Sequence, residues 1–519
     1  MKYFDRNSLM IVVGVAIFTI FFGIGGVPLL DPDEPVYAET AREMIQFGDF
    51  LSPRIFGEYW YDKPPMYYWL VALAQLVFGD NEFAARFPAA LMAAGTVVMV
   101  YVSGTKLFNE KAGFWSALIL TSSIQFFYMG KAAVTDTTLL FFMTGAILSF
   151  IHKRYWLMYV CMAFATVTKG PIGIVFPGAI IFIYLLVMGR LREILSMHVI
   201  RGLLLYLLIA SPWYYAMYTV HGMPFIETFL GFHNVTRFTT PEHASRVTIW
   251  YYFPVIILGM FPWTGILFQS IKDSISDSRI DDMKNLVLLH VWWGFVFLFF
   301  TVCQTKLTSY ILPMWPPMAM IIGWNISRMI QKQHYNTKFY SWMVGSGLVF
   351  ALLGIGWIVG GEYLPEVRFG MTVLGCMTLV LGAAAVFTLW YFRDIQLAAW
   401  MHVAIGIVTM GVVFTFLMPV IADRFSVKTI SAIYEERCDQ NKTIYVDKFL
   451  RPGFMYYSGT AGIEMLPKTG AFADAIRDGE EKYILVRGLE LRRLRKAQTA
   501  PDNLQTIAEV SDIYLLEQK

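Results

Sequence analysis

Acidic residues that could move a proton gather directly after the first apolar run. The segment LLDPDEPVYAETAREM contains Asp31, Asp33 and Glu34, and its two prolines stiffen the turn. A carboxylate at a membrane surface can serve as a general base, because burial beside lipid disfavours its charged form. Asp33 and Glu34 are therefore candidate catalytic residues. The alternative is that the acids cap a helix beginning near Pro35 and complement its dipole.

A second segment, EYWYDKPPMYYW, places Lys63 among aromatic residues and before two prolines. An aromatic belt at the level of the lipid headgroups would explain the rings. It does not explain Lys63, and an ammonium held near the headgroup plane by a stiff turn suits a lipid phosphate. We therefore predict that Lys63 binds a lipid phosphate, and we assign Tyr37, Tyr61 and Asp62 to the pocket around it.

Three further segments bring one acid and two cations to the ends of apolar runs. In MGKAAVTDTT, Asp136 either caps a helix or supplies a second catalytic carboxylate. In VTKGPIG, snorkelling would explain Lys169, but the following Gly-Pro implies a fixed turn and a fixed ammonium. In QTKLTSYILPMWPP, Lys306 and Tyr310 are either interfacial anchors or residues lining a cavity, because prolines interrupt the span. Lys169, Lys306 and Tyr310 are predicted to bind the donor phosphate.

The segment HGMPFIETFLGFHNVTRFTTPEHASR contains His221, His233, His243 and Arg237. The spacing of the histidines matches no compact metal-ligand motif, so no metal is predicted. Arg237 is the stronger candidate, because a planar guanidinium binds phosphate through two parallel hydrogen bonds. We predict that no cofactor is required. The three histidines leave a divalent metal open as the alternative.

The elements that carry these segments are expected to be membrane spans. The chain is 57% hydrophobic and 15% charged, whereas soluble domains carry about 25% charged residues. Apolar runs predict about thirteen spans. They lie near residues 8–29, 83–105, 112–130, 136–151, 155–169, 171–188, 200–220, 249–270, 285–303, 308–327, 340–360, 370–392 and 398–420. Residues 66–78 are apolar but short, which suits a helix at the interface.

Basic residues in the loops predict which side of the membrane each loop occupies. An N-terminus inside the cell places the lysines and arginines of six consecutive loops inside as well. The first run, too long for a signal sequence, is expected to be retained. Residues 1–424, with outer loops 31–82 and 221–248, would form a transmembrane catalytic domain. Residues 425–519 would form a small α/β domain on the outer face. The net charge of +3 gives no reason to expect a nucleic-acid partner.

At these residues the sequence resembles the bacterial aminoarabinose transferases of lipid A, within the wider superfamily that includes the protein O-mannosyltransferases. The matching pieces occur in the order found in that family, over residues 28–325. They are DPDEPVYAETAREM, YDKPPMYYW, the Asp136 turn, TKG, NVTRF, WYYFPVIILGMFPW and KLTSYILPMWPPMAM. The resemblance implies the GT-C fold, a polytopic α-helical membrane protein with helices lying along the outer face and a small C-terminal α/β domain.

The resemblance also implies roles for individual residues. Asp33 would be the essential acid of the first outer loop, and Asp136 the second functional acid. Lys63 and Arg237 would contact the lipid phosphate, while Lys169, Lys306 and Tyr310 would line the donor pocket. The predicted function is transfer of 4-amino-4-deoxy-L-arabinose, or a related sugar, from undecaprenyl phosphate to lipid A. The periplasmic face of a bacterial inner membrane is the expected place. The alternatives are transfer to a protein hydroxyl, as in O-mannosylation, and a flippase for lipid-linked sugars.

Overall fold

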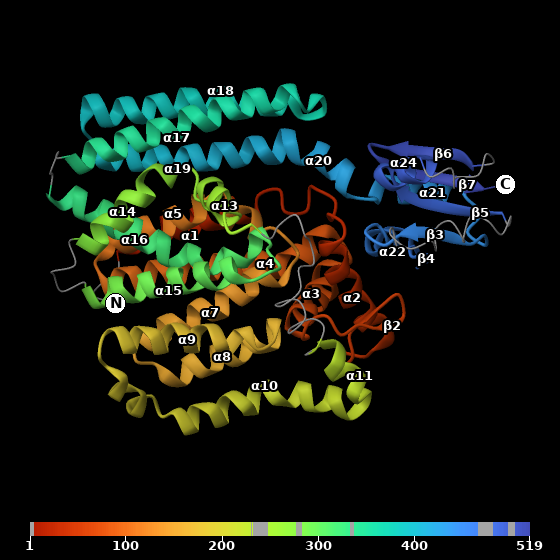
Figure 1. Ribbon diagram of the computed structural model, residues 1–519, viewed down its shortest axis with the longest axis horizontal. Coiled ribbons are helices and arrows are strands. Elements are labelled where there is room, and N and C mark those ends of the chain that lie inside the picture. Colours follow the sequence, from red (N-terminus) through yellow and green to blue (C-terminus); the bar gives the residue numbers. More distant parts are fainter. Residues whose placement is uncertain are drawn as a thin grey trace. The chain divides into compact units, whose positions relative to one another are not determined.

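The chain divides into two compact units in the computed structural model, which describes residues 5–229, 231, 248–276, 283–332, 337–465, 481–496 and 504–518 (Figure 1). The first unit comprises Met1–Phe22, Tyr61–Tyr67 and Phe87–Val413. The second comprises Gly23–Trp60, Tyr68–Arg86 and Phe414–Lys519. The second unit thus combines most of the first predicted outer loop with the C-terminal region. The domain boundary at residue 424 stays a prediction.

The first unit is built from apolar helices at nearly all the predicted positions. They are α1 (Arg6–Phe21), most of α4 (Glu82–Leu107), α5 (Glu110–Ser122), α6 (Ile124–Met129), α7 (Thr135–Ile151), α8 (Tyr155–Lys169), α9 (Ile172–Val187), α10 (Val199–His221), α11 (Met223–Ile226), α13 (Tyr252–Gly259), α14 (Thr264–Ser276), α15 (Met283–Val302), α16 (Trp315–Lys332), α17 (Thr337–Glu362), α18 (Arg368–Phe387) and α19 (Ile395–Val412). Figure 1 shows α17, α18 and α19 running side by side, as do α7, α8 and α10.

The length and composition of these helices identify a multi-pass membrane protein. Among the described residues, six helical segments are long and apolar enough to cross a membrane. The bent pair α13 and α14 would add a seventh, and four shorter apolar helices accompany them. Two of the shorter ones are α1 and α3 (Met66–Phe78), and the bounds of α3 match the predicted interfacial helix. The total of thirteen spans stays a prediction.

Several predicted spans are broken. The run 249–270 forms α13 and α14, and the chain bends by 106° between these two helices. The run 308–327 begins as a 3₁₀ helix, Thr308–Met314, and becomes α-helical only at Trp315, which confirms the interruption expected from its prolines. The run 8–29 is helical only to Phe21, so the prediction was too long at this end.

Small residues allow the helices of the first unit to approach closely. A Cβ atom on Gly323 of α16 would lie 2.3 Å from the Ser116 hydroxyl oxygen and 2.6 Å from the Ser116 amide nitrogen of α5. A Cβ atom on Gly375 of α18 would lie 2.6 Å from the carbonyl oxygen of Gly354 in α17. Glycine at these points lets backbone pack on backbone, which is a common way for helices to associate in lipid.

The second unit contains helices of the first outer loop and a mixed sheet. Its helices are α2 (Asp33–Phe47), most of α3, α20 (Met418–Phe425), α21 (Lys428–Arg437), α22 (Arg451–Ser458) and α24 (Gly488–Lys496). Strands β1 (Arg54–Ile55) and β2 (Glu58–Tyr59) form a short hairpin. Strands β3 (Ile444–Asp447), β4 (Ile463–Met465), β5 (Lys482–Arg487), β6 (Leu504–Val510) and β7 (Ile513–Gln518) form a sheet in the order β4-β3-β5-β7-β6.

The sheet confirms the predicted α/β character of the C-terminal region. Strands β4, β3 and β5 are parallel, whereas β7 is antiparallel to β5 and β6. Alternating apolar residues of the sheet pack against α21 and α22 in one core cluster that contains Tyr434, Val446, Phe454, Leu485 and Leu515. Strands β4 and β6 and helix α22 were not predicted, because their short, mixed sequences lack a clear apolar period.

Candidate functional site

Three residues that the sequence singled out meet in the first unit. The Lys169 ammonium donates to Asp136 Oδ1 at 2.8 Å, and the two side chains are only 16% and 13% exposed. The same ammonium lies 5.4 Å from the centre of the Tyr310 ring. These residues come from three different helical segments, α7, α8 and the 3₁₀ helix Thr308–Met314, which the fold brings together. Their predicted roles stay predictions. The arrangement can present a cation beside an acid to a bound anion.

Two local features place the Asp136 and Lys169 side chains. Lys169 is the last residue of α8, and Gly170 turns the chain with φ of +82°, a conformation that favours glycine. Asp136 lies in the first turn of α7, whose N-cap is Val134. Asp136 is therefore not the N-cap residue of α7, although it lies in the first turn, where a carboxylate complements the helix dipole. Its carboxylate also accepts a hydrogen bond from Lys169.

Lys306 is a buried cation that precedes Tyr310 in the same segment. Its side chain is 2% exposed, and its ammonium donates to the carbonyl oxygen of Cys303. Within the described part of the chain, no carboxylate forms an ion pair with it. A buried ammonium is costly unless an anion compensates it, so this position favours phosphate binding.

Lys63 and Asp62 form a second cation and acid pair in the first unit. The Lys63 ammonium lies 2.8 Å from Asp62 Oδ1, and both side chains are largely buried. The neighbouring Tyr61 ring contacts the His221 ring at 5.3 Å and the Phe225 ring at 5.7 Å. The predicted pocket residues Tyr61 and Asp62 therefore lie directly before Lys63. The Tyr61 ring packs against the end of α10 and against α11.

In the second unit, Asp33 opens helix α2 and is exposed. The helix begins at Asp33 and not near Pro35, and Pro32 at the N-cap makes no side-chain capping hydrogen bond. A carboxylate at the start of a helix is stabilised by the amide groups and the dipole of the first turn. Of the three neighbouring acids Asp31, Asp33 and Glu34, Asp33 is the exposed one. Tyr37, one turn later, is buried against Tyr68, with 5.7 Å between the ring centres.

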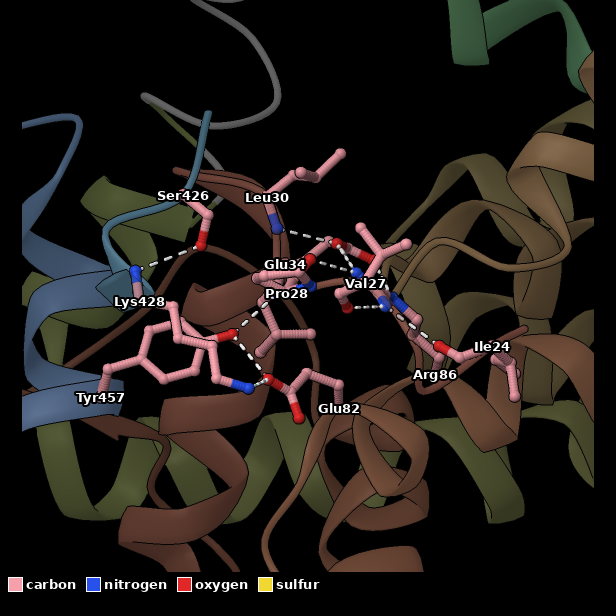
Figure 2. A network of polar contacts seen from close by, with 11 residues as sticks. Ile24, Val27, Pro28, Leu30, Glu34, Glu82, Arg86, Ser426, Lys428 and Tyr457 are labelled. Carbon is pink, nitrogen blue, oxygen red and sulfur yellow. Dashed lines mark hydrogen bonds and ion pairs between the residues drawn. The ribbon is translucent and has the colours of Figure 1, made fainter. Parts of the chain in front are cut away.

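Glu34 is held by a residue that sequence reasoning missed, Arg86 of α4 (Figure 2). Arg86 Nε lies 2.9 Å from Glu34 Oε1, and Arg86 Nη2 lies 2.6 Å from Glu34 Oε2. The guanidinium also donates to the carbonyl oxygens of Ile24, Val27 and Pro28. Both Glu34 and Arg86 are 5% exposed. Because its carboxylate is buried and paired, Glu34 suits a positioning role better than the catalytic role predicted for it.

The first helix is shorter than predicted because glycines follow it directly. Gly23 has a φ of +70°, a conformation that favours glycine and ends the helix, and Pro28 has no amide that could donate to the Ile24 carbonyl oxygen. Arg86 satisfies the carbonyl oxygens of Ile24, Val27 and Pro28 in this non-helical stretch. The sequence signal for Arg86 was an arginine inside an otherwise apolar run, since a buried charge of this kind requires partners.

Asp31 also makes structural contacts within the second unit. Its Oδ1 accepts from the amide of Gly453 at 3.0 Å, and its Oδ2 accepts from the amide of Val427 at 3.1 Å. Burial raises the pKa of Asp31 well above its usual range, while the two amides lower it. Asp31 is therefore engaged by the C-terminal region rather than presented to a substrate.

The predicted phosphate-binding residue Arg237 lies outside the described residues, as do His233 and His243, which were weighed as metal ligands. Among the residues that the structure describes, no group of three or more His, Cys, Asp or Glu side chains has an arrangement that could hold a metal ion. The first unit thus contains lysines paired with acids, and the second unit, described by itself, contains an acidic loop. Such groups can stabilise a leaving phosphate and orient an acceptor.

Comparisons with known proteins agree with this chemistry. The family described as dolichyl-phosphate-mannose-protein mannosyltransferase matches residues 62–215. An uncharacterized protein of Aquifex aeolicus is 31% identical over 348 residues, which are 67% of this chain and 78% of the relative.

An undecaprenyl phosphate-alpha-4-amino-4-deoxy-L-arabinose arabinosyl transferase of Aeromonas hydrophila is 28% identical over 331 residues. These make up 61% of this chain and 60% of that enzyme. The fold matches the crystal structure of ArnT from Cupriavidus metallidurans bound to undecaprenyl phosphate, with a TM-score of 0.83, 19% identity and coverage of 99% of this chain and 98% of that one. The chain therefore belongs to the GT-C superfamily of membrane glycosyltransferases, which use sugars linked to polyprenyl phosphate and include the aminoarabinose transferases and the protein O-mannosyltransferases.

Proposed function

We propose that the protein transfers 4-amino-4-deoxy-L-arabinose, or a closely related sugar, from undecaprenyl phosphate to lipid A. The acceptor would be modified on the periplasmic face of a bacterial inner membrane. The N-terminus would be cytoplasmic and the C-terminal domain periplasmic. The similarity to the arabinosyl transferase of Aeromonas hydrophila supports this choice of donor and sugar.

The observation that carries the proposal is the cluster of Asp136, Lys169 and Tyr310 together with the buried Lys306. In the proposed reaction an acceptor oxygen forms a bond to the anomeric carbon while the bond from that carbon to the donor phosphate oxygen breaks. Negative charge develops on the departing undecaprenyl phosphate, and fixed cations stabilise it. We assign this task to Lys63, Lys169, Lys306 and Arg237, with Tyr310 beside Lys169.

The acids have separate tasks in this proposal. Asp33, which is exposed at the start of α2, orients the acceptor or takes its proton. Asp136 assists by holding the Lys169 ammonium in place through their 2.8 Å contact. Glu34 positions the loop through Arg86, and Tyr37, Tyr61 and Asp62 shape the pocket. Attack opposite the departing phosphate inverts the configuration at the anomeric carbon.

The test is transfer by the purified protein from undecaprenyl-phosphate-linked aminoarabinose to lipid A. Asp33→Asn is expected to lower turnover by at least about a hundredfold while binding of undecaprenyl phosphate is retained, since a positioned acid or base typically contributes that much. Lys169→Gln is expected to weaken donor binding instead. Arg368→Gln, in an exposed ion pair with Glu362, is the matched charge control and should behave like the wild type. Normal turnover of Asp33→Asn would refute the assignment.

A second candidate is transfer to a protein hydroxyl, which the mannosyltransferase family match over residues 62–215 favours. Mass spectrometry of lipid A and of membrane proteins, from cells with and without the gene, separates the two. A mass increment of one pentose derivative on lipid A supports the proposal. If the sugar is found only on protein, the acceptor is a protein and the assignment of lipid A is wrong.

A further inference from the structure

We propose that helix α22 of the C-terminal region is a positioning element for glycosyl transfer, and that Gly453 and Tyr457 on it hold the loop that carries Asp33. The inference rests on the proposed role of Asp33. It adds a task for the C-terminal domain, which contributes none of the residues assigned to donor or acceptor. All the contacts that support it lie within the second unit.

The first contact joins Gly453 to Asp31, two residues before Asp33. The Gly453 amide donates to Asp31 Oδ1 at 3.0 Å, and the Val427 amide donates to Asp31 Oδ2 at 3.1 Å. The Asp31 amide in turn donates to the carbonyl oxygen of Phe425 at 2.7 Å. The carboxylate and the backbone amide of Asp31 are thus both hydrogen-bonded to the backbone of the C-terminal region. A Cβ atom on residue 453 would lie 2.3 Å from Asp31 Oδ1, so any larger residue there must displace the Asp31 carboxylate.

The second contact joins Tyr457, one turn further along α22, to both sides of the loop. Its hydroxyl accepts from the Leu29 amide at 2.8 Å and lies 3.1 Å from Glu82 Oε1, to which it donates (Figure 2). Leu29 begins the acidic segment, and Glu82 is the first residue of α4. One partly buried hydroxyl therefore links the loop, α22 and the helix that carries Arg86.

Helix α2 also contacts α22, near the C-terminal end of α22. Arg42 donates to the carbonyl oxygens of Met455 and Tyr456 at 3.0 and 2.9 Å. Both carbonyl groups lie in the last turn of α22, and the Met455 carbonyl also accepts from the Gly459 amide at 2.9 Å. The Tyr456 hydroxyl donates to Asp80 at 2.9 Å.

The loop before Asp33 is therefore fixed from two directions. Arg86 holds Glu34 and three carbonyl groups, while α22 holds Leu29 and Asp31. The loop is not helical between residues 24 and 30, so these side-chain contacts replace the missing helical hydrogen bonds. A displacement of about 1 Å in a catalytic group can cost a hundredfold in rate, so loosening either attachment should reduce turnover.

The experiment compares Tyr457→Phe with Tyr514→Phe in the purified full-length protein. Tyr514 of β7 is the matched control, because its hydroxyl donates to Glu509 of the neighbouring strand β6 at 2.6 Å, away from the acidic loop. Tyr457→Phe is expected to lower kcat about tenfold with an unchanged KM for undecaprenyl-phosphate-linked aminoarabinose. Hydrogen exchange should speed up in the peptide covering residues 24–40. Tyr514→Phe should leave all three quantities unchanged.

A second pair of variants tests the glycine. Gly453→Ala should lower kcat more than Tyr457→Phe, because its methyl group displaces Asp31. Placed in an Asp31→Ala background, the same change should have a much smaller additional effect. Equal effects in both backgrounds would show that Gly453 does not act through Asp31 and would overturn the inference.

The readouts separate this inference from the proposed function. If Tyr457→Phe retains the wild-type kcat, or if exchange in residues 24–40 does not change, α22 is not a positioning element. If the wild type transfers no sugar but Asp33→Asn and Tyr457→Phe both retain undecaprenyl phosphate binding, the proposed acceptor is wrong. The rate of hydrogen exchange in residues 24–40 then still decides whether α22 restrains the loop.

Discussion

The guanidinium of Arg86 uses all five of its N–H donors, two on Glu34 and three on backbone carbonyl groups. A lysine in this place has three donors and no planar fork. We expect Arg86→Lys to destabilise the protein by on the order of 3 kcal/mol even though the charge is kept, because Glu34 and at least one carbonyl group lose their partners.

Thermal unfolding in detergent micelles checks this prediction. The matched control is Arg368→Lys, which changes the same residue type in an ion pair whose side chains are more than half exposed. An unfolding temperature of Arg86→Lys equal to that of the control would show that the ammonium serves as well as the guanidinium. The positioning role of Glu34 would then lose its support.

At the scale of a single helix, α2 carries a buried acid whose ionisation opposes folding. Burial raises the pKa of Glu39 to about 7, while the contact with Arg42 at 2.5 Å opposes the rise. The unfolded value is 4.5, so the folded state holds the proton more tightly. The stability from this group is complete below pH 4.5 and is lost as the pH rises toward 7 and above it. The pKa difference corresponds to about 3 kcal/mol.

Unfolding measured between pH 4.5 and 8 checks this expectation. Glu39→Gln removes the titrating group and should flatten the decline over that range. Glu366→Gln changes an exposed acid in the loop before α18 and should leave the profile unchanged. A profile that is equally steep in Glu39→Gln and in the wild type would contradict the prediction.

The pairing of α5 with α16 predicts a different kind of sensitivity. Gly323→Ala places a methyl group against the backbone and the hydroxyl of Ser116, so the helices must separate. We expect a loss of about 2 kcal/mol, as for other overpacked interfaces. Gly356→Ala in α17, where the new methyl group meets nothing within 4 Å, should be neutral or slightly stabilising. Equal unfolding temperatures for the two variants would contradict the prediction.

At the scale of the whole molecule, the distribution of basic residues predicts which loops face the periplasm. In a cysteine-free background, Asn441→Cys lies in the C-terminal domain and Arg154→Cys in a loop predicted to be cytoplasmic, and both positions are exposed. A membrane-impermeant maleimide should label residue 441 in cells with a permeabilised outer membrane. It should label residue 154 only after the inner membrane is opened. The opposite pattern would reverse the proposed orientation.

Much of the architecture could be predicted because hydropathy is a local property of the chain. A run of apolar residues excludes water wherever it occurs, so α7, α8 and α9 were found within one or two residues of their observed ends. The end of α1 was placed too late because the prediction followed hydropathy and passed over Gly23, whose φ of +70° ends the helix. The bond from Arg86 to the Ile24 carbonyl oxygen was missed because the two residues lie 62 positions apart. Helix α22 was missed because its eight residues have no clear period.

The sequence by itself determined that this chain is a multi-pass membrane protein and which segments carry its acids and cations. Only the tertiary structure decided which of these groups are partners. Asp136 meets Lys169 across 33 residues, Glu34 meets Arg86 across 52, and Asp31 meets Gly453 across 422. The physical reason is that a buried charge must find a partner, but the packing of distant elements decides which partner lies within reach.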